Sequence, residues 1–445
     1  MNRFLPLSDN EREQMLREIG REDLFSPIPK DLRLKEDLKI ESRSEQEILA
    51  FFKNLAEMNK NLVSFAGAGV YHHFIPSAVD YISSREEFLT AYTPYQPEIS
   101  QGTLQAIFEY QTMMCNILDM EVSNASMYDG ATALAESVLM AKRIVKKKNT
   151  VAISKAVHPH YLKVVKTYLK NLGINIVEIP VKDFITDIDA LKNILSENED
   201  IFAVAVGYPN FYGSVEDLKA IVELTKNYNK KAMVITSTTE PLAFGVITPP
   251  GTFGVDIACG EAQSFGNYPG FGGPLLGFLT CREKNVRQMP GRVAGQTIDL
   301  DGKTGYVLTL SAREQHIKRE RATSNICSNQ GWCMLRATIY LSLLGEEGFK
   351  KLAKLNYSLS EYAKEKINST SKFKVVNVNP TFNEFTVQTE VDFLKFRAMC
   401  EENGIFPGVH LAKFGLDKDK FILTCTEVIN TEHIDKLVSL MEKAQ

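Results

Sequence analysis

The sequence lacks the features that would assign it at once to several protein classes. Its least charged stretch, 262–281, is interrupted by two prolines and five glycines and is excluded as a membrane helix. Lys and Arg number 51 against 55 Asp and Glu, a net charge of −4, which excludes a general nucleic-acid-binding protein. The seven cysteines form no CxxC pair, so a reduced, cytoplasmic chain is expected. The first twenty residues have no apolar core, and Asp9, Glu11 and Glu13 argue against a targeting peptide.

Two further motifs are incomplete. Gly67-Ala68-Gly69 has His72 where a dinucleotide-binding GxGxxG loop needs its third glycine, so NAD binding is not predicted. The pairs His72-His73 and His158-x-His160 have no HExxH motif or Cys/His set beside them. No metal site is therefore predicted.

What is present is ordinary globular composition, with 44% hydrophobic residues over 445 positions. Residues 1–60 are predicted to form a helical arm that packs on another surface. Ser44 and Glu47 have the spacing of a capping box, and Phe51, Phe52 and Leu55 follow at helical spacing.

From residue 61 to 325, short apolar runs alternate with amphipathic stretches. This alternation predicts a large α/β domain whose mostly parallel sheet is covered on both faces. The expected strands are 150–153, 174–179, 201–207, 232–236, 255–259 and 275–280, and the expected helices are 102–118, 161–172, 188–193 and 215–228.

Residues 326–445 are predicted to form a linking helix and a smaller α+β domain. The helix is expected from Asn325 to Leu344, with Gly345 as its stop. The expected strands after it are 373–378, 384–388 and 421–424, and the expected helices are 391–403 and 431–443. A cleft between the two domains is the expected place for a ligand.

The turn Tyr128–Ala133 is the first candidate site. Gly130 and Thr132 stand at an apparent helix N-terminus, where free N–H groups could hold a phosphate. The alternative is a tight turn in which Asp129 or Thr132 only caps the helix, and the residues alone leave both open.

Polar residues gather in two other segments. The loop Tyr92–Glu98, with Tyr95 and Gln96, either lines a site or is a surface loop. In 311–321, Ser311 and Glu314 have capping-box spacing, and Arg313, Ile317 and Arg321 are expected on one helical face. That face would hold a carboxylate or phosphate, or else be solvated.

Thr323, Ser324 and Asn325 are expected to open the long helix, as a second anion-binding helix start. The glycines of 266–274 would let the backbone approach a ligand closely, with Arg292 beside them.

Four segments together resemble the glycine cleavage system P protein. They are YTPYQPEISQGTLQ (92–105), SNASMYDGATALAE (123–136), MPGRVAGQ (289–296) and REQHIKRERATSNIC (313–327). The resemblance covers nearly the whole chain. Its length is similar to that of subunit 1 of the two-subunit form, which corresponds to the N-terminal half of the long form.

The resemblance implies a pyridoxal-phosphate (PLP) enzyme of fold type I, like aspartate aminotransferase. Such a site needs a Schiff-base lysine, an acid for the pyridine nitrogen, a stacking ring and a phosphate cradle. Gly130, Thr132 and His158 correspond to the cradle and the ring. The acid position reads Thr236–Thr239, and the lysine position reads Gln263-Ser264, within a stretch from Lys231 to Lys284 that contains no lysine.

The resemblance therefore implies a chain without covalently bound cofactor that completes the active site of a homologous, PLP-carrying subunit 2. The pair would decarboxylate glycine and pass the aminomethyl group to the lipoyl arm of H protein, beside the T and L proteins. Thr323, Ser324 and Asn325 are expected to reach the partner's cofactor phosphate. The residues expected to face substrate or the lipoyl arm are Tyr95, Gln96, Glu98, Arg292 and Arg313. The alternatives are a non-catalytic regulatory or scaffold subunit and an independent transaminase-like enzyme with a displaced lysine.

Overall fold

The computed structural model describes residues 7–36 and 38–445, which fall into two units that meet in sequence between Lys60 and Asn61. Within the first unit, two α-helices form, α1 (Asp9–Glu18) and α2 (Glu45–Glu57). The predicted capping box of α2 is confirmed: the Glu47 N–H donates to Ser44 Oγ, and the Ser44 N–H donates to the Glu47 carboxylate. Neither helix has a buried side chain.

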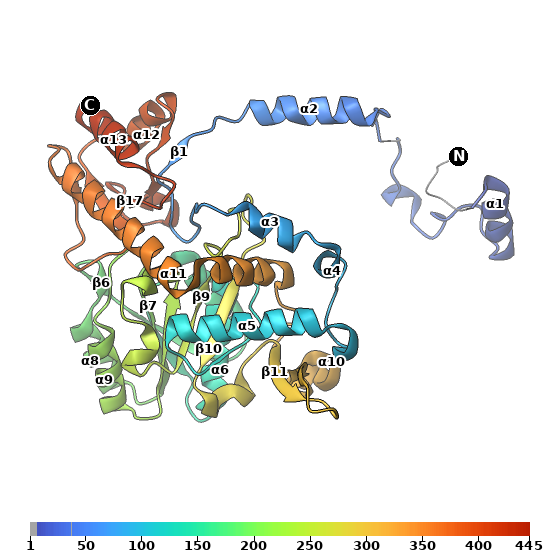
Figure 1. The fold of residues 1–445 in the computed structure, drawn as a ribbon, viewed down its shortest axis with the longest axis horizontal. Coiled ribbons are helices and arrows are strands. Elements are labelled where there is room, and N and C mark those ends of the chain that lie inside the picture. Colours follow the sequence, from blue (N-terminus) through green and yellow to red (C-terminus); the bar gives the residue numbers. More distant parts are fainter. Residues whose placement is uncertain (1–6, 37) are drawn as a thin grey trace. The chain divides into compact units, whose positions relative to one another are not determined.

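The second unit is built around a seven-stranded sheet with the strand order β2-β10-β9-β8-β7-β3-β4 (Figure 1). Neighbouring strands from β9 to β4 run parallel, whereas β10 is antiparallel to both β9 and β2. The predicted mostly parallel sheet is therefore confirmed. The strands are β2 (Val122–Ser123), β3 (Thr150–Ser154), β4 (Asn175–Ile179), β7 (Ile201–Gly207), β8 (Met233–Thr238), β9 (Ile257–Glu261) and β10 (Gly277–Cys281).

Helices cover both faces of this sheet. Every residue of β7 is buried, because its side chains enter two apolar cores in turn. Val204 and Val206 belong to the core that includes side chains of α5 (Gln101–Leu118), α8 (Ile188–Glu197), α9 (Leu218–Tyr228) and α11 (Gly331–Asn368). Phe202 and Ala205 belong to the core built with α6 (Gly130–Ile144) and α7 (Pro159–Leu169).

The long helix differs from its prediction at its start. It begins at Gly331, six residues after the expected Asn325, and continues to Asn368. Gly345 does interrupt it, with φ 59° and ψ −178°, so the first helical stretch ends where predicted. Two N–H groups between residues 325 and 330 are bound to distant side chains: the Cys327 N–H donates to Tyr128 Oη and the Gln330 N–H donates to Ser126 Oγ.

The C-terminal part, which carries β17, α12 and α13 in Figure 1, has its own sheet in the order β13-β14-β17-β16. It also has its own apolar core. Its elements are β13 (Phe373–Val375), β14 (Glu384–Thr389), α12 (Phe393–Glu402), β15 (Ile405–Phe406), β16 (Val409–His410), β17 (Lys420–Thr424) and α13 (Thr431–Lys443). β1 (Val63–Ser64) pairs with β15 in parallel. The predicted boundary between a large and a small domain at residues 325 and 326 stays a prediction.

Several elements were not predicted. They include α3 (Ser77–Ser83), α4 (Glu86–Leu89), the hairpin β5 (Val181–Lys182) and β6 (Ile185–Thr186), the hairpin β11 (Val293–Ile298) and β12 (Thr304–Thr309), and the two-residue strands β1, β2, β15 and β16. No helix in the described ranges 7–36 and 38–445 is long and apolar enough to cross a membrane.

Candidate functional site

Segments far apart in the sequence meet around Arg292, which lies between β10 and β11 and is 3% exposed. Its Nη2 donates to Tyr95 Oη (3.3 Å) and to the Cys327 carbonyl (3.0 Å). The guanidinium carbon lies 5.3 Å from the centre of the Tyr95 ring, a cation–π distance. Tyr95, Arg292, Arg313, Glu314 and His316 are called the arginine cluster below.

A buried carboxylate completes this cluster. Glu314 Oε2 lies 3.9 Å from Arg292 Nε and 3.6 Å from His316 Nδ1. The rings of Tyr95 and His316 are 5.9 Å apart, edge to face. Tyr95 and His316 are exposed, so they form the solvent side of the cluster, while Arg292 and Glu314 form its buried side.

The guanidinium groups keep spare hydrogen-bonding capacity. Arg313 Nη2 donates to the Gly291 carbonyl (2.8 Å), and burial lowers the pKa of Arg313. Within the described part of the chain, neither Arg292 Nε nor Arg313 Nε has a hydrogen-bond partner. A buried, unpaired N–H that belongs to a guanidinium cation favours an anionic ligand.

The segment Thr323–Asn325 is attached to the same cluster by its backbone. The Thr323 N–H donates to the Arg313 carbonyl (3.0 Å), and Gln315 Nε2 donates to the Asn325 carbonyl (3.0 Å). Thr323 and Ser324 are half-buried and Asn325 is exposed. The structure therefore brings these residues together with Arg292, Arg313 and Tyr95.

The prediction of a capped helix in residues 311–321 and of a helix start at Thr323–Asn325 was wrong. Residues 311–321 form three short pieces, η6 (Ser311–Arg313), α10 (Gln315–Lys318) and η7 (Arg319–Arg321), and Ser311 caps none of them. Arg313 is buried whereas Ile317 and Arg321 are exposed, so the three do not share a face. Glu314 is close to Arg292 and does not form the expected capping box. Thr323–Asn325 do not start a helix, since α11 begins at Gly331.

Gln96 and Glu98 lie on the loop that carries Tyr95, and both are exposed. Their side chains make no hydrogen bond to any other residue that the structure describes. Their predicted role therefore stays a prediction.

The predicted phosphate cradle at the start of α6 is already filled by protein groups. Asp129 and Thr132 form a reciprocal capping box, with the Thr132 N–H donating to Asp129 Oδ1 (2.7 Å). The Gly130 N–H donates to Glu261 Oε2 (2.9 Å), at the end of β9. Burial raises the pKa of Glu261 to about 7, although it also accepts the N–H groups of Gln263 and Leu276. A phosphate would have to displace this carboxyl.

His158 is also fully engaged. Its Nε2 lies 2.9 Å from the Ala68 carbonyl, and its Nδ1 accepts the His160 N–H (3.1 Å). Its ring contacts Tyr161 and Phe211 at centroid distances of 4.8 and 4.9 Å. Burial lowers its pKa to about 4, so the ring is neutral at pH 7. His158 packs as an aromatic core residue here.

The lysine position holds a structural amide. Gln263 Oε1 accepts the Tyr71 N–H (2.9 Å), and its Nε2 donates to the carbonyls of Tyr71 (3.0 Å) and Asn267 (2.6 Å). Ser264 Oγ donates to Glu240 (2.8 Å). With no amine, a filled cradle and no acid at the end of β8, the residues of this chain do not fit a covalently bound PLP.

A charged network next to Ser264 was not predicted. His73 lies between two carboxylates, with Nε2 2.9 Å from Glu240 and Nδ1 2.8 Å from Glu427. Burial opposes charge on His73, but the carboxylates raise its pKa to about 10 and so keep it protonated. In the sequence, the only indication of this network was the pair His72-His73, which was considered as a possible metal motif. Across residues 7–36 and 38–445, no group of three or more potential ligands is placed to hold one.

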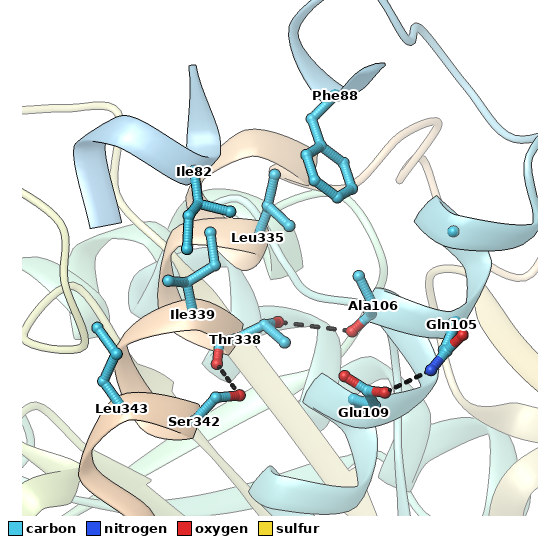
Figure 2. A pocket seen from close by; sticks show the side chains of 11 residues that line it. Ile82, Phe88, Gln105, Ala106, Glu109, Leu335, Thr338, Ile339, Ser342 and Leu343 are labelled. Carbon is cyan, nitrogen blue, oxygen red and sulfur yellow. Dashed lines mark hydrogen bonds between the residues drawn. The ribbon is translucent and has the colours of Figure 1, made fainter. Parts of the chain in front are cut away.

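An apolar groove of about 350 Å³ lies between α3, α4, α5 and α11 (Figure 2). Ile82, Phe88, Leu335, Ile339 and Leu343 supply its apolar side chains, and Gln105 and Glu109 lie on the α5 side. Since it has no cluster of catalytic groups, the arginine cluster is the better candidate for chemistry.

Comparison with known proteins identifies the family. The family model "Glycine cleavage system P-protein" matches residues 2–441. A protein from Geotalea daltonii, named probable glycine dehydrogenase (decarboxylating) subunit 1, is 46% identical, and the match covers 99% of each chain. A protein of the same name from Bacillus cytotoxicus is 45% identical, and the match covers 100% of each chain.

Solved structures confirm the predicted fold. A crystal structure of glycine decarboxylase (P-protein) of the glycine cleavage system, in inhibitor-bound form, has a TM-score of 0.88 and 37% identity, covering 99% of each chain. A NifS-like protein shares the fold alone, with a TM-score of 0.64 and 15% identity, covering 86% of this chain and 98% of its own. The fold is that of the PLP-dependent fold type I enzymes. The chain belongs to the glycine cleavage system P-protein family.

Proposed function

We propose that this chain is subunit 1 of a two-chain glycine decarboxylase and that it completes an active site whose lysine and PLP belong to a homologous subunit 2. The observation that carries the proposal is a contrast within the chain. The position of its own cofactor is filled by Glu261 and Gln263, whereas the arginine cluster keeps two buried guanidinium groups whose Nε–H groups find no partner in the described part of the chain.

The four segments that resemble the family support this proposal, because they meet in the structure. Tyr95 (92–105) contacts Arg292 (289–296), Tyr128 (123–136) accepts the Cys327 N–H, and Arg313 (313–327) donates to Gly291. Buried charges cost stability, and they are concentrated at functional sites, where that cost is offset by what they do. Binding an anionic group of the substrate or of the partner's cofactor is the role that suits them here.

We assign Arg292 and Arg313 to holding negative charge, with Glu314 positioning Arg292. We assign Thr323, Ser324 and Asn325 to the partner's cofactor phosphate, and Tyr95, Gln96 and Glu98 to the side that meets substrate or the lipoyl arm of H protein. The assembled enzyme would pass the aminomethyl group to that arm, beside the T and L proteins. We place it in the cytoplasm, which is supported by seven unpaired thiols.

The test is co-expression with the candidate subunit 2. We expect glycine–bicarbonate exchange only from the pair, and borohydride reduction followed by mass analysis should place the pyridoxyl group on subunit 2. Full activity in subunit 2 alone would instead support a regulatory or scaffold chain. A pyridoxyl group on this chain alone would reject the proposal and support an enzyme with a displaced lysine.

Substitutions in the arginine cluster test the residue roles. Arg292→Ala and Thr323→Ala should each lower exchange by the pair at least about tenfold, as expected for lost anion contacts of 1.4 kcal/mol or more. Arg321→Ala, an exposed cation on the same segment, is the matched control and should keep full activity. Arg292→Lys keeps the charge but loses the guanidinium geometry, and thermal unfolding of each variant checks that loss of activity is not loss of folding. Unchanged exchange in both alanine variants would show that the assignment is wrong.

A further inference from the structure

Glu136 is a buried carboxyl beside Ser324 to which the proposed function gives no role. It lies on α6 and is 1% exposed, and its Oε2 has no hydrogen-bond partner within residues 7–36 and 38–445. A buried acceptor without a partner is costly, so it calls for an explanation in the same way as the unpaired Nε–H groups of the arginine cluster.

The groups that face Glu136 come from three segments of the chain. Burial raises its pKa above the ordinary value, and outweighs the opposite effects of Ser324, which is placed to hydrogen-bond the carboxyl, and of Arg143, two turns further along α6. From α7, Tyr168 faces the same carboxyl: burial, and then the charge of Glu136, raise the pKa of that hydroxyl. Glu136 therefore binds a proton more readily than an exposed glutamate does.

Arg143 connects this carboxyl with the arginine cluster. Its Nη2 donates to the Gln288 carbonyl (3.0 Å), whereas its Nε has no partner in the part of the chain that the structure describes. Burial lowers the pKa of Arg143, the charge of Glu136 opposes this effect, and the charge of Arg313 adds to it. Two neighbouring cations and one carboxyl leave a positive charge that a bound anion would balance.

The Ser324 hydroxyl has a single proton to donate. Its Oγ accepts the Ile326 N–H (3.1 Å), which leaves one lone pair for a second donor. While Glu136 is charged, the hydroxyl proton is held by the carboxylate and is not available to an anion. Once Glu136 is protonated, the carboxyl O–H can donate to the remaining lone pair of Oγ, and the hydroxyl proton can turn to an anion.

We infer that Glu136 is a positioning residue, which takes up a proton from solvent when an anion binds at the arginine cluster and so directs the Ser324 hydroxyl to that anion. This inference deepens the proposed function, from which it takes the anion-binding role of Ser324. Since the coupling is reciprocal, a bound anion favours the protonated carboxyl and a low pH strengthens anion binding. Affinity for the anion should therefore fall as the pH rises through the titration of Glu136 in the free chain.

Sulfate is the probe for this test, because it is a tetrahedral dianion whose charge stays constant over the pH range used. His316, on the solvent side of the cluster, also loses its charge over about pH 5 to 8, so every chain compared carries His316→Gln. Calorimetry on the full isolated chain measures the Kd for sulfate. With Glu136 in place, we expect Kd to rise at least about fivefold over this range, since full coupling gives tenfold per pH unit.

Glu136→Gln is the decisive variant, because its amide can donate to Ser324 at every pH. Its Kd should change less than about twofold over the same range and stay close to the low-pH value of the chain that keeps Glu136. A merely structural role would weaken binding at every pH instead. Glu197→Gln makes the same change at an exposed position on α8, on the other face of the sheet, and should keep the full pH dependence.

Ser324→Ala tests the route through the hydroxyl. In that background, Glu136→Gln should alter the pH dependence much less than it does with Ser324 present. If the whole effect of Glu136→Gln persists without the hydroxyl, Glu136 acts through its charge alone and the positioning role is wrong.

Two further results would overturn the inference. One is a Kd for sulfate that does not depend on pH, or depends on it equally with and without Glu136→Gln; the other is no binding of sulfate to the chain. Glycine–bicarbonate exchange by the pair tests the proposed function separately. Exchange by the pair together with either result would leave the proposed function standing, whereas sulfate binding governed by Glu136 in a chain whose pair shows no exchange would support the proton-coupled anion site and reject that function.

Discussion

Restoring the missing lysine at residue 263 should not restore cofactor binding. Gln263 is 1% exposed and its amide makes three hydrogen bonds, two of them to the backbone of Tyr71. In Gln263→Met, of similar volume, the Tyr71 N–H and the carbonyls of Tyr71 and Asn267 lose this partner. A buried group left unpaired costs about 1 to 3 kcal/mol, so the free energy of unfolding should fall by about 3 kcal/mol or more.

Gln263→Lys should cost at least as much. The ammonium can still donate to the two carbonyls, but it sets a second donor against the Tyr71 N–H and must be buried as a charge. The Gly130 N–H remains bound to Glu261, so pyridoxal phosphate finds no free cradle beside the new amine. Urea unfolding gives the free energies, and borohydride reduction with mass analysis detects any adduct. A pyridoxyl-lysine at position 263, or unfolding free energies within about 1 kcal/mol of the parent chain for both variants, would refute this reasoning.

Two further predictions concern folding alone. Burial raises the pKa of Glu261 and of Glu384 to about 7 in the folded chain, above the ordinary value near 4.3, so the folded state binds these protons more tightly. The free energy of unfolding should therefore fall as the pH rises from 5 to 8, by up to about 3 kcal/mol per carboxyl. Measured by urea unfolding, this dependence on pH should be weaker in Glu384→Gln. A free energy of unfolding that rises over this pH range would contradict the prediction. A Cβ at Gly130 would meet Tyr161 Oη, so Gly130→Ala should cost about 2 kcal/mol. Tyr161→Phe in the same chain should recover part of that cost in thermal unfolding, and strictly additive losses would show that the clash is not the cause.

The sheet could be predicted because its signal is local. Strands such as β7 are continuous apolar runs, and the helices between them have clear amphipathic spacing. The hairpin β11–β12 was missed because its side chains are only partly buried and show no apolar alternation. The start of α11 was missed because the N–H groups before it bind Tyr128 and Ser126, about 200 residues away in sequence.

The candidate site was predictable in its members and not in its geometry. Arg292 and Arg313 could be selected as clustered charges, but their buried contacts form only when the loop of Tyr95 and the segments around Gly291 and Cys327 come together. Glu314 was read as a helix cap from its spacing to Ser311, whereas the structure places it against Arg292. A serine and a glutamate three positions apart cannot distinguish a capping box from a carboxylate that contacts a distant arginine.

The vestigial cofactor position and the arginine cluster differ in how their buried polar groups are paired. A chain that had merely lost its lysine would keep an open cradle at Gly130 and a free ring at His158. Here Glu261, Gln263 and the contacts of His158 fill that space with paired groups, so the region now serves packing. In the arginine cluster, by contrast, the Nε–H groups of Arg292 and Arg313 have no hydrogen-bond partner within the described residues. Since an unpaired buried donor is costly, the unpaired Nε–H groups of Arg292 and Arg313, beside Tyr95 and Thr323, favour a ligand brought by another chain.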